Sequence, residues 1–254
     1  MLLNSGKTCY DAPMKIGVYG LGRFGSFWAR LLAGLGGEVV GYNRTPGRPV
    51  PEGVTEVELT SLLESDAIFL CVAISAVEGV VAEIADGLSR GTVVLDTCSV
   101  KVHPVTVMDR LLPPGVEVVG THPMFGPDSA QAGVAGLPMI ITPVRSSGET
   151  VLSWKRRFGA LGLRVVQMSP EQHDREAAYT QGITHFIGRV LKKLDVAPSE
   201  IGTLGYRKIL EVVEQTCNDP YQLFLDLQRF NPYTAGMREE LRTAFEAVLA
   251  SLEK

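Results

Sequence analysis

The 254-residue chain has little cysteine and histidine and no excess of positive charge, and each shortage excludes a class of protein. The four cysteines, at positions 9, 71, 98 and 217, have the spacing of neither a metal site nor a disulfide framework. We therefore predict no metal, and reduced thiols in the cytoplasm. A net charge of -4 excludes the broad basic face that nucleic acid requires. No apolar run approaches the ~20 residues of a membrane span, and no signal-peptide pattern is visible.

Apolar residues, in contrast, are plentiful. The composition is 45% hydrophobic and 20% charged, which is ordinary for a soluble protein with a full core. Over residues 14–168, apolar runs alternate with amphipathic stretches, so we predict a doubly wound, Rossmann-type α/β domain with a parallel sheet. The expected strands cover residues 15–19, 38–42, 67–72, 92–96, 116–122, 138–142 and 164–168, and the expected helices include 24–35, 76–88 and 148–161.

The pattern changes at Ser169-Pro170-Glu171-Gln172, which has a capping serine, a proline at the first helical position and a glutamine three residues after the cap. Beyond it we expect only helices, over 170–194 and 206–216, from 219–220, and after 231–232. Residues 1–13 should form a loose tail and residues 169–254 a helical substrate-binding domain. Because this short domain is rich in leucine, isoleucine and valine, we predict that it forms a homodimer.

Gly20-Leu21-Gly22-Arg23-Phe24-Gly25 matches the pattern G-x-G-x-x-G between a predicted strand and a predicted helix. In that context the first glycine permits a tight turn, the second lets the backbone approach a pyrophosphate, and the third allows close packing. The start of the following helix attracts phosphate. We predict that these six residues bind a dinucleotide.

The end of the second predicted strand indicates which dinucleotide. NAD-binding folds usually have an acid there, for the ribose 2′-hydroxyl, whereas this chain has Asn43-Arg44-Thr45. Arg44 can pair with a 2′-phosphate and Thr45 can donate a hydrogen bond to it. The sequence thus favours NADP, with NAD as the alternative if Arg44 is only a solvated surface charge.

Two later strand ends carry polar residues, Asp96-Thr97-Cys98-Ser99-Val100-Lys101 and His122-Pro123-Met124-Phe125-Gly126-Pro127. With the glycine motif before them, they resemble the prephenate and arogenate dehydrogenases of tyrosine biosynthesis, which combine a fingerprint, an Asp-x-x-Ser-Val-Lys segment and a His-Pro-Met-Phe-Gly-Pro loop. Residues 171–185 resemble that family's first helix. Residues 188–191, 205–206 and 210–214 are most similar to its plant-type arogenate branch.

The resemblance implies an oxidative decarboxylation, in which NAD(P) removes hydride from a cyclohexadienol dicarboxylate and carbon dioxide leaves. His122 corresponds to the family's catalytic histidine and would accept the ring hydroxyl proton, a task suited to an imidazole. Ser99 corresponds to a serine that hydrogen-bonds near this hydroxyl. The alternative for His122 is a purely structural role at a strand end. We expect His173 and His103 at the surface.

The resemblance also implies residues that bind the dicarboxylate. Arg207 follows Tyr206 as in the bacterial prephenate branch, where an arginine grips a substrate carboxylate. His185 corresponds to a histidine that faces the substrate, its alternative being helix packing. Lys101 either anchors an anion or faces solvent.

Other interpretations remain open. β-Hydroxyacid dehydrogenases and imine reductases share the glycine fingerprint, but they need a lysine or aspartate on the first long helix, where this chain offers His185. A non-catalytic dinucleotide sensor would have lost Ser99, His122 and His185. For the substrate, Asp128 could pair with the ammonium of arogenate, whereas Arg207 and the absence of an acid at Thr142-Pro143 favour prephenate.

Overall fold

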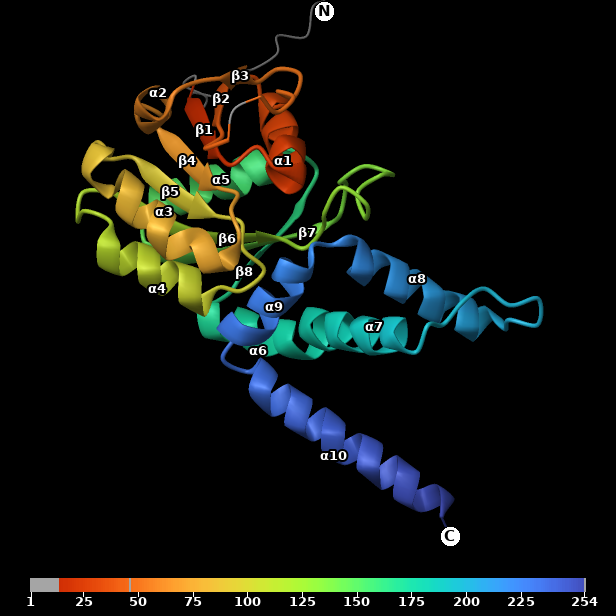
Figure 1. Ribbon diagram of the computed structural model, residues 1–254. Helices are drawn as coiled ribbons and strands as arrows, with labels where there is room; N and C mark the ends of the chain where they lie inside the picture. The colour runs from red at the N-terminus through yellow and green to blue at the C-terminus, as the bar shows by residue number, and fades with distance from the viewer. Residues whose placement is uncertain (1–13, 46, 254) are drawn as a thin grey trace, which may run out of the picture.

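The computed structural model describes residues 14–45 and 47–253, so the expected tail, with Cys9, lies outside the described residues (Figure 1). Within this part, eight strands form one sheet in the order β3-β2-β1-β4-β5-β6-β7-β8. The strands are β1 (Lys15–Tyr19), β2 (Glu38–Tyr42), β3 (Thr55–Glu56), β4 (Ala67–Leu70), β5 (Val93–Asp96), β6 (Glu117–Pro123), β7 (Pro138–Arg145) and β8 (Arg164–Gln167). This order, running outward in both directions from β1 and β4, is that of a dinucleotide-binding fold.

Helices cover both faces of the sheet, as the alternation predicts (Figure 1). They are α1 (Arg23–Ala33), α2 (Leu59–Leu63), η1 (Ile74–Ala76), α3 (Val77–Ile84), η2 (Ala85–Gly87), α4 (Val102–Leu111) and α5 (Gly148–Ala160). Neighbouring residues of a strand point to opposite faces. Phe69 of β4 therefore packs on Trp28 of α1 and Trp154 of α5, at ring-centroid distances of 5.7 and 5.1 Å, while Ile68 and Leu70 join the core under α3 and α4.

One feature of the sheet corrects the sequence prediction. Strand β7 runs antiparallel to β6, with His122 opposite Ile140, so the sheet is mixed rather than wholly parallel. No helix lies between the two strands, only the loop that follows His122. Without a helical crossover the chain reverses direction, because a parallel neighbour requires one. Antiparallel pairing thus holds the histidine-bearing end of β6 against a second strand.

After β8 the described chain has helices and connecting loops but no strand, as predicted. It comprises α6 (Pro170–Ala177), a π-helical turn η3 (Ala178–Gly182), α7 (Ile183–Lys193), α8 (Leu204–Asn218), α9 (Tyr221–Phe230) and α10 (Thr234–Leu252). The capping box at Ser169 is confirmed, since its hydroxyl accepts from the Gln172 N–H and the Gln172 side chain accepts from the Ser169 N–H. Figure 1 shows α10 leaving the body of the protein. None of the helices described is both long and apolar enough to cross a membrane.

Candidate active site

A cavity of about 800 Å³ lies at the carboxyl ends of the central strands. Its lining comes from the segments that follow β1, β4, β5 and β6, and on the other side from η3, α7 and the α8–α9 turn. The strand order reverses direction between β1 and β4, and ligands of open α/β sheets bind at such a switch point. The sheet therefore places the glycine motif and the His122 loop on one cavity.

The three motif glycines meet three different demands. Gly20 has a φ of +98°, and a Cβ there would lie 2.6 Å from the carbonyl oxygen of Cys71. At Gly25 a Cβ would lie 1.8 Å from the Gly20 carbonyl oxygen, so the α1 helix could not pack against the turn. Gly22, in contrast, has nothing within 4 Å of an added Cβ. Its lack of a side chain leaves open space beside the cavity rather than serving the packing of the chain itself.

The start of α1 fits the phosphates of a dinucleotide. In the part of the chain that the structure describes, no side chain caps this helix end. Its first turn contains no acidic residue, and Gly22 to Gly25 line the cavity. The first N–H groups of a helix lack partners within the helix and attract anions. Asn43 helps to hold the loop, because its Oδ1 accepts a hydrogen bond from the Leu21 N–H at 2.7 Å. Arg44 and Thr45 follow β2 and are exposed.

His122 lies near the end of β6, is 3% exposed and lines the cavity, as does Ser99. Burial, followed by the neighbouring His173 and Lys101, holds the pKa of His122 well below the usual histidine value. The imidazole is therefore neutral at neutral pH and able to accept a proton. This position is consistent with the base predicted from the sequence, and the role itself stays a prediction.

The expected surface position of His173 is wrong. His173 is 2% exposed, and its Nε2 lies 2.8 Å from Nδ1 of His122. Its α6 helix packs onto the sheet domain, which the sequence of α6 alone does not reveal. His103 is not freely exposed either, since it is half-buried with its ring centroid 4.4 Å from that of Phe230. Neither residue lines the cavity.

Both alternatives for Lys101 are also wrong. Its side chain is 0% exposed, forms an ion pair with the equally buried Asp96, and donates to the carbonyl oxygen of Thr121 at 2.5 Å. Burying a lysine costs free energy unless the lysine is paired in this way. The charge of Lys101 is therefore neutralised by Asp96 and does not face a substrate anion or solvent. Lys101 connects the end of β5 to the residue before His122 and so supports the cavity wall from beneath.

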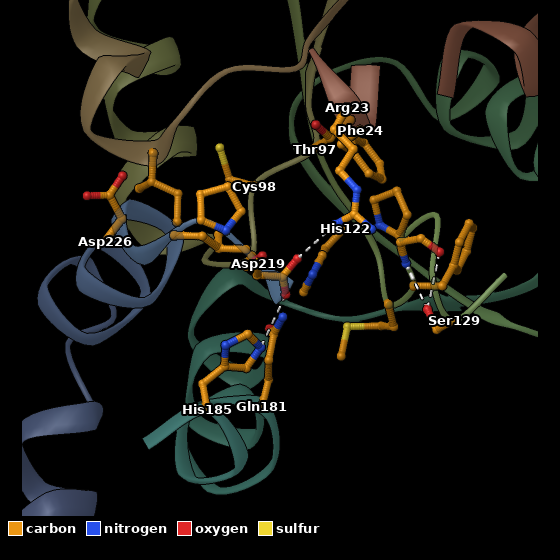
Figure 2. A pocket seen from close by; sticks show the side chains of 18 of the residues that line it. Arg23, Phe24, Thr97, Cys98, His122, Ser129, Gln181, His185, Asp219 and Asp226 are labelled. Atoms are coloured by element: carbon orange, nitrogen blue, oxygen red, sulfur yellow. Dashed lines mark hydrogen bonds and ion pairs between the residues drawn. The ribbon is translucent and has the colours of Figure 1, made fainter. Parts of the chain in front are cut away.

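An ionic network crosses the cavity, as Figure 2 shows. Arg23 pairs with Asp128 and lies 3.8 Å from Asp219, which in turn lies 4.0 Å from Nε2 of His185. His185 is 7% exposed and lines the cavity from α7. Burial lowers its pKa to about 4, so it is neutral at neutral pH, and its Nδ1 has no hydrogen-bond partner among the described residues. Burial also raises the pKa of Asp219.

Comparison with known proteins identifies the family. Residues 36–167 match the nucleotide-binding domain of prephenate dehydrogenase, and residues 190–254 match the TYRAAT1-like C-terminal domain. Arogenate dehydrogenase 2 of Arabidopsis thaliana, a chloroplastic protein, is 34% identical over an aligned length of 253 residues that covers 95% of this chain and 71% of that protein. The chain belongs to the prephenate and arogenate dehydrogenase family. Arogenate dehydrogenase 1 of the same plant is 33% identical, over 98% of this chain and 40% of the relative.

Solved structures of this family share the fold. A prephenate dehydrogenase from A. aeolicus, in complex with hydroxyphenyl propionate and NAD+, aligns with a TM-score of 0.71 at 20% identity, over 96% of this chain and 93% of that one. Synechocystis arogenate dehydrogenase aligns with a TM-score of 0.68 at 20% identity, over 94% and 93%. Enzymes of the family carry out NAD(P)-dependent oxidative decarboxylation in tyrosine biosynthesis. Membership decides against the β-hydroxyacid dehydrogenase and imine reductase alternative.

One residue expected from the family resemblance does not reach the cavity of its own chain. Arg207 is exposed on the first part of α8, and the cavity is lined only by the far end of that helix, at Gln215 and Thr216. Eight helical residues span roughly 12 Å, which separates the backbone of Arg207 from that of Gln215. The sequence predicted a helix over 206–216 but could not show which part of it faces the cavity.

The sequence analysis also missed the π-helical turn η3. We predicted one continuous helix over 170–194, but residues 178–182 are wound more widely, and Tyr179, Thr180 and Gln181 line the cavity there. Such turns are frequent at functional sites. Gly182 was the available signal, because a glycine inside a helical pattern weakens regular winding. Among the described residues, no three His, Cys, Asp or Glu side chains are grouped as metal ligands would be.

Proposed function

We propose that this dehydrogenase oxidatively decarboxylates arogenate and prephenate, with NADP as the preferred cofactor and arogenate as the preferred substrate. The observation that carries this proposal is the single cavity lined by both the glycine motif and His122. A nicotinamide ring reaching from the motif and a base on β6 can then act on one substrate ring. The family assignment supplies the reaction type.

The chain's own residues would handle the proton and the substrate. When bound, the nicotinamide would accept hydride from the ring carbon that carries the hydroxyl. His122 would accept the proton of that hydroxyl as the ring oxygen becomes a carbonyl, and Ser99 would hydrogen-bond to the same oxygen. The carbon–carbon bond to the ring carboxylate then breaks, its electron pair makes the ring aromatic, and the oxygen regains a proton as the phenol. General-base assistance of this kind typically contributes about 10²–10⁴ in rate.

The charge lining the cavity supports arogenate over prephenate. Among the described residues, one basic side chain of the Lys or Arg type, Arg23, and three carboxylates, Asp128, Asp219 and Asp226, line the cavity. Asp226 is occupied by hydrogen bonds from Ser75, while Asp128 and Asp219 share Arg23. Prephenate carries two negative charges, whereas the ammonium of arogenate cancels one of them. An acidic cavity opposes the first more strongly, and Asp128 or Asp219 can pair with the ammonium.

Steady-state kinetics with each acid and each nicotinamide cofactor tests the function directly. We expect turnover of both acids, a higher kcat/KM for arogenate, and tighter binding of NADP than of NAD. Arg44→Ala should weaken NADP roughly 10- to 100-fold, since a charge-assisted bond contributes about 1.5–3 kcal/mol, and should leave NAD unchanged. Turnover of neither acid would reject the proposed function, and equal loss of both cofactors would reject the role of Arg44.

A pair of variants tests the substrate preference. Asp219→Asn and Asp128→Asn should each lower kcat/KM for arogenate roughly tenfold, as expected for the loss of one charge-assisted contact, while prephenate improves or is unchanged. Asp86→Asn is the matched control, because Asp86 is exposed and does not line the cavity. A parallel loss for both acids would show that these carboxylates only hold Arg23.

We also propose that residues 169–254 form a domain of their own and a homodimer interface. Large apolar side chains remain exposed there, among them Phe245 at 65% and Leu252 at 77% on α10. Apolar patches of this kind usually mark an interaction surface. Leu249→Glu should shift the protein to monomer in light scattering. The free thiols of Cys71, Cys98 and Cys217 suit the reducing cytoplasm, which we propose as its compartment.

A further inference from the structure

His122 does not stand alone beneath the cavity. Its Nδ1 lies 2.8 Å from Nε2 of His173, and Nδ1 of His173 lies 2.8 Å from Oδ1 of Asp174. All three side chains are nearly or wholly buried, Asp174 at 0% exposure. His122 comes from β6, whereas the other two come from α6, so the row is made by docking the helical part onto the sheet. We call these three side chains the imidazole row.

The far end of the row is the carboxylate of Asp174. Asp174 accepts hydrogen bonds from the backbone N–H groups of Lys101 at 2.6 Å and Val102 at 2.9 Å, at the start of α4. Both oxygens of this carboxylate therefore act as acceptors, Oδ1 toward Lys101 and Oδ2 toward Val102. The Asn231 side chain donates to the Asp174 carbonyl oxygen at 2.8 Å, which holds this part of α6 in place. An ionised carboxylate can only accept hydrogen bonds.

The carboxylate therefore determines where each proton of the row lies. Nδ1 of His173 must donate to Asp174, so in the neutral ring Nε2 of His173 is bare and accepts. Nδ1 of His122 must then carry the hydrogen of the 2.8 Å contact. This leaves Nε2 of His122 as the bare nitrogen, and within the described residues no hydrogen bond reaches it. The partner of one ring nitrogen thus selects the tautomer of the ring.

We propose that His173 and Asp174 are positioning residues that keep His122 in the tautomer whose bare Nε2 takes the substrate proton. As His122 becomes an imidazolium, its Nδ1–H bond to His173 becomes charge-assisted, and the negative charge of Asp174 lies one ring further along. Lys101, which pairs with Asp96 beside the row, opposes this added charge. The proposal rests on the proposed function for its kinetic consequence, but the tautomer itself does not.

Nitrogen-15 NMR of the unmodified protein, labelled on histidine and free of substrate, measures the tautomer directly. The chain has only four histidines, so removing each in turn assigns every signal. At neutral pH we expect a proton on Nδ1 of His122 and none on Nε2. A proton on Nε2 of His122 would overturn the proposal, whatever the enzyme turns over and whether or not any variant folds.

Two substitutions at His173 connect the tautomer to turnover. His173→Leu removes the acceptor, so kcat should fall roughly 10- to 100-fold, as for other histidines deprived of the partner that orients them, while KM and cofactor binding stay near normal. His173→Gln supplies a carbonyl oxygen where Nε2 was and should restore most of kcat together with the Nδ1–H signal. His103→Gln, outside the cavity, is the control and should change neither quantity.

The outcomes separate the two proposals. Unchanged kcat in His173→Leu, or a His173→Gln protein as slow as the leucine variant, would reject the positioning role even though the enzyme works. If the unmodified protein turns over neither acid, the proposed function fails. The NMR result would then still decide whether the row sets the tautomer of His122.

Discussion

The two walls of the cavity differ in how firmly the chain itself holds them. On the sheet side, Asp96 and Lys101 are 0% exposed and His122 is 3% exposed, and each has a buried partner. On the helical side, Tyr179 of η3 lines the cavity and is 45% exposed, and away from the cavity Ile201 is 92% exposed and Leu252 is 77% exposed. The base is therefore set by close packing inside one chain. The helical part, in contrast, leaves large apolar side chains uncovered away from the cavity. The residues around the base are thus more tightly packed than the helical part of the chain.

The sharpest way to break the sheet wall is an added methyl group at Gly25. Gly25→Ala places a Cβ 1.8 Å from the Gly20 carbonyl oxygen, and backbone cannot yield cheaply, so we expect at least about 3 kcal/mol of lost stability or no folding. Gly22→Ala is the matched variant, with nothing within 4 Å. Its stability in urea should stay within about 0.5 kcal/mol of the unmodified protein. The affinity of Gly22→Ala for the cofactor should fall. Unchanged binding would show that the cofactor phosphates do not lie against this turn.

The base on the sheet wall should matter more than the histidine on the helical wall. His122→Asn should lower kcat by about 10²–10⁴ with little effect on cofactor binding, because proton transfer is lost while the fold and the glycine motif remain. His185→Asn should act mainly on KM. The unmodified enzyme should keep its rate as the pH falls below the usual histidine pKa of 6.5. The reason is that neutral His122 is the active form and its pKa is lowered. Near-normal turnover by His122→Asn would show that His122 is not the base.

Acid should lower the stability of the protein because His185, on the helical wall, is buried in its neutral form. The pKa of His185 is about 4 in the fold and 6.5 as a free side chain, so between these values the unfolded chain binds a proton that the folded chain refuses. The free energy of unfolding should fall as pH drops from 6.5 toward 4, by at most about 1.4 kcal/mol per unit from this group. His185→Gln should flatten the dependence of the urea midpoint on pH. The half-buried His103 should contribute less, and an unaltered slope in His185→Gln would contradict the assignment.

The smallest effect is expected at Arg207, the exposed arginine of α8. Because it does not line the cavity, Arg207→Ala should change kcat/KM by no more than about twofold, the effect of an ordinary surface substitution. Kinetics with both acids measure this. A tenfold loss confined to substrate binding would instead indicate that α8 of a second copy brings its Arg207 to the site. In that case two copies of the chain would together form the helical wall of the cavity.

Much of the fold was predictable because buried strands leave a local signature. Strands β1 and β2 have the predicted bounds, since each is an apolar run ended by a turn. Helix α4 was not among the helices named from the sequence; its Pro104 stands in the first turn, where proline is tolerated. The antiparallel β7 depends on how a loop reverses, and periodicity along one strand carries no information on its neighbour's direction.

The candidate site divides in the same way. The spacing of Gly20, Gly22 and Gly25 and the strand-end position of His122 could be inferred from sequence, because each depends on a few adjacent residues. The burial of Lys101 and the contact between His122 and His173 could not, since they join segments up to 51 residues apart. The chain alone therefore specifies a dinucleotide turn, a histidine at a strand end and the family to which they belong. Only the docking of α6 on the sheet decides which nitrogen of His122 faces the cavity, because that choice depends on partners distant in the chain.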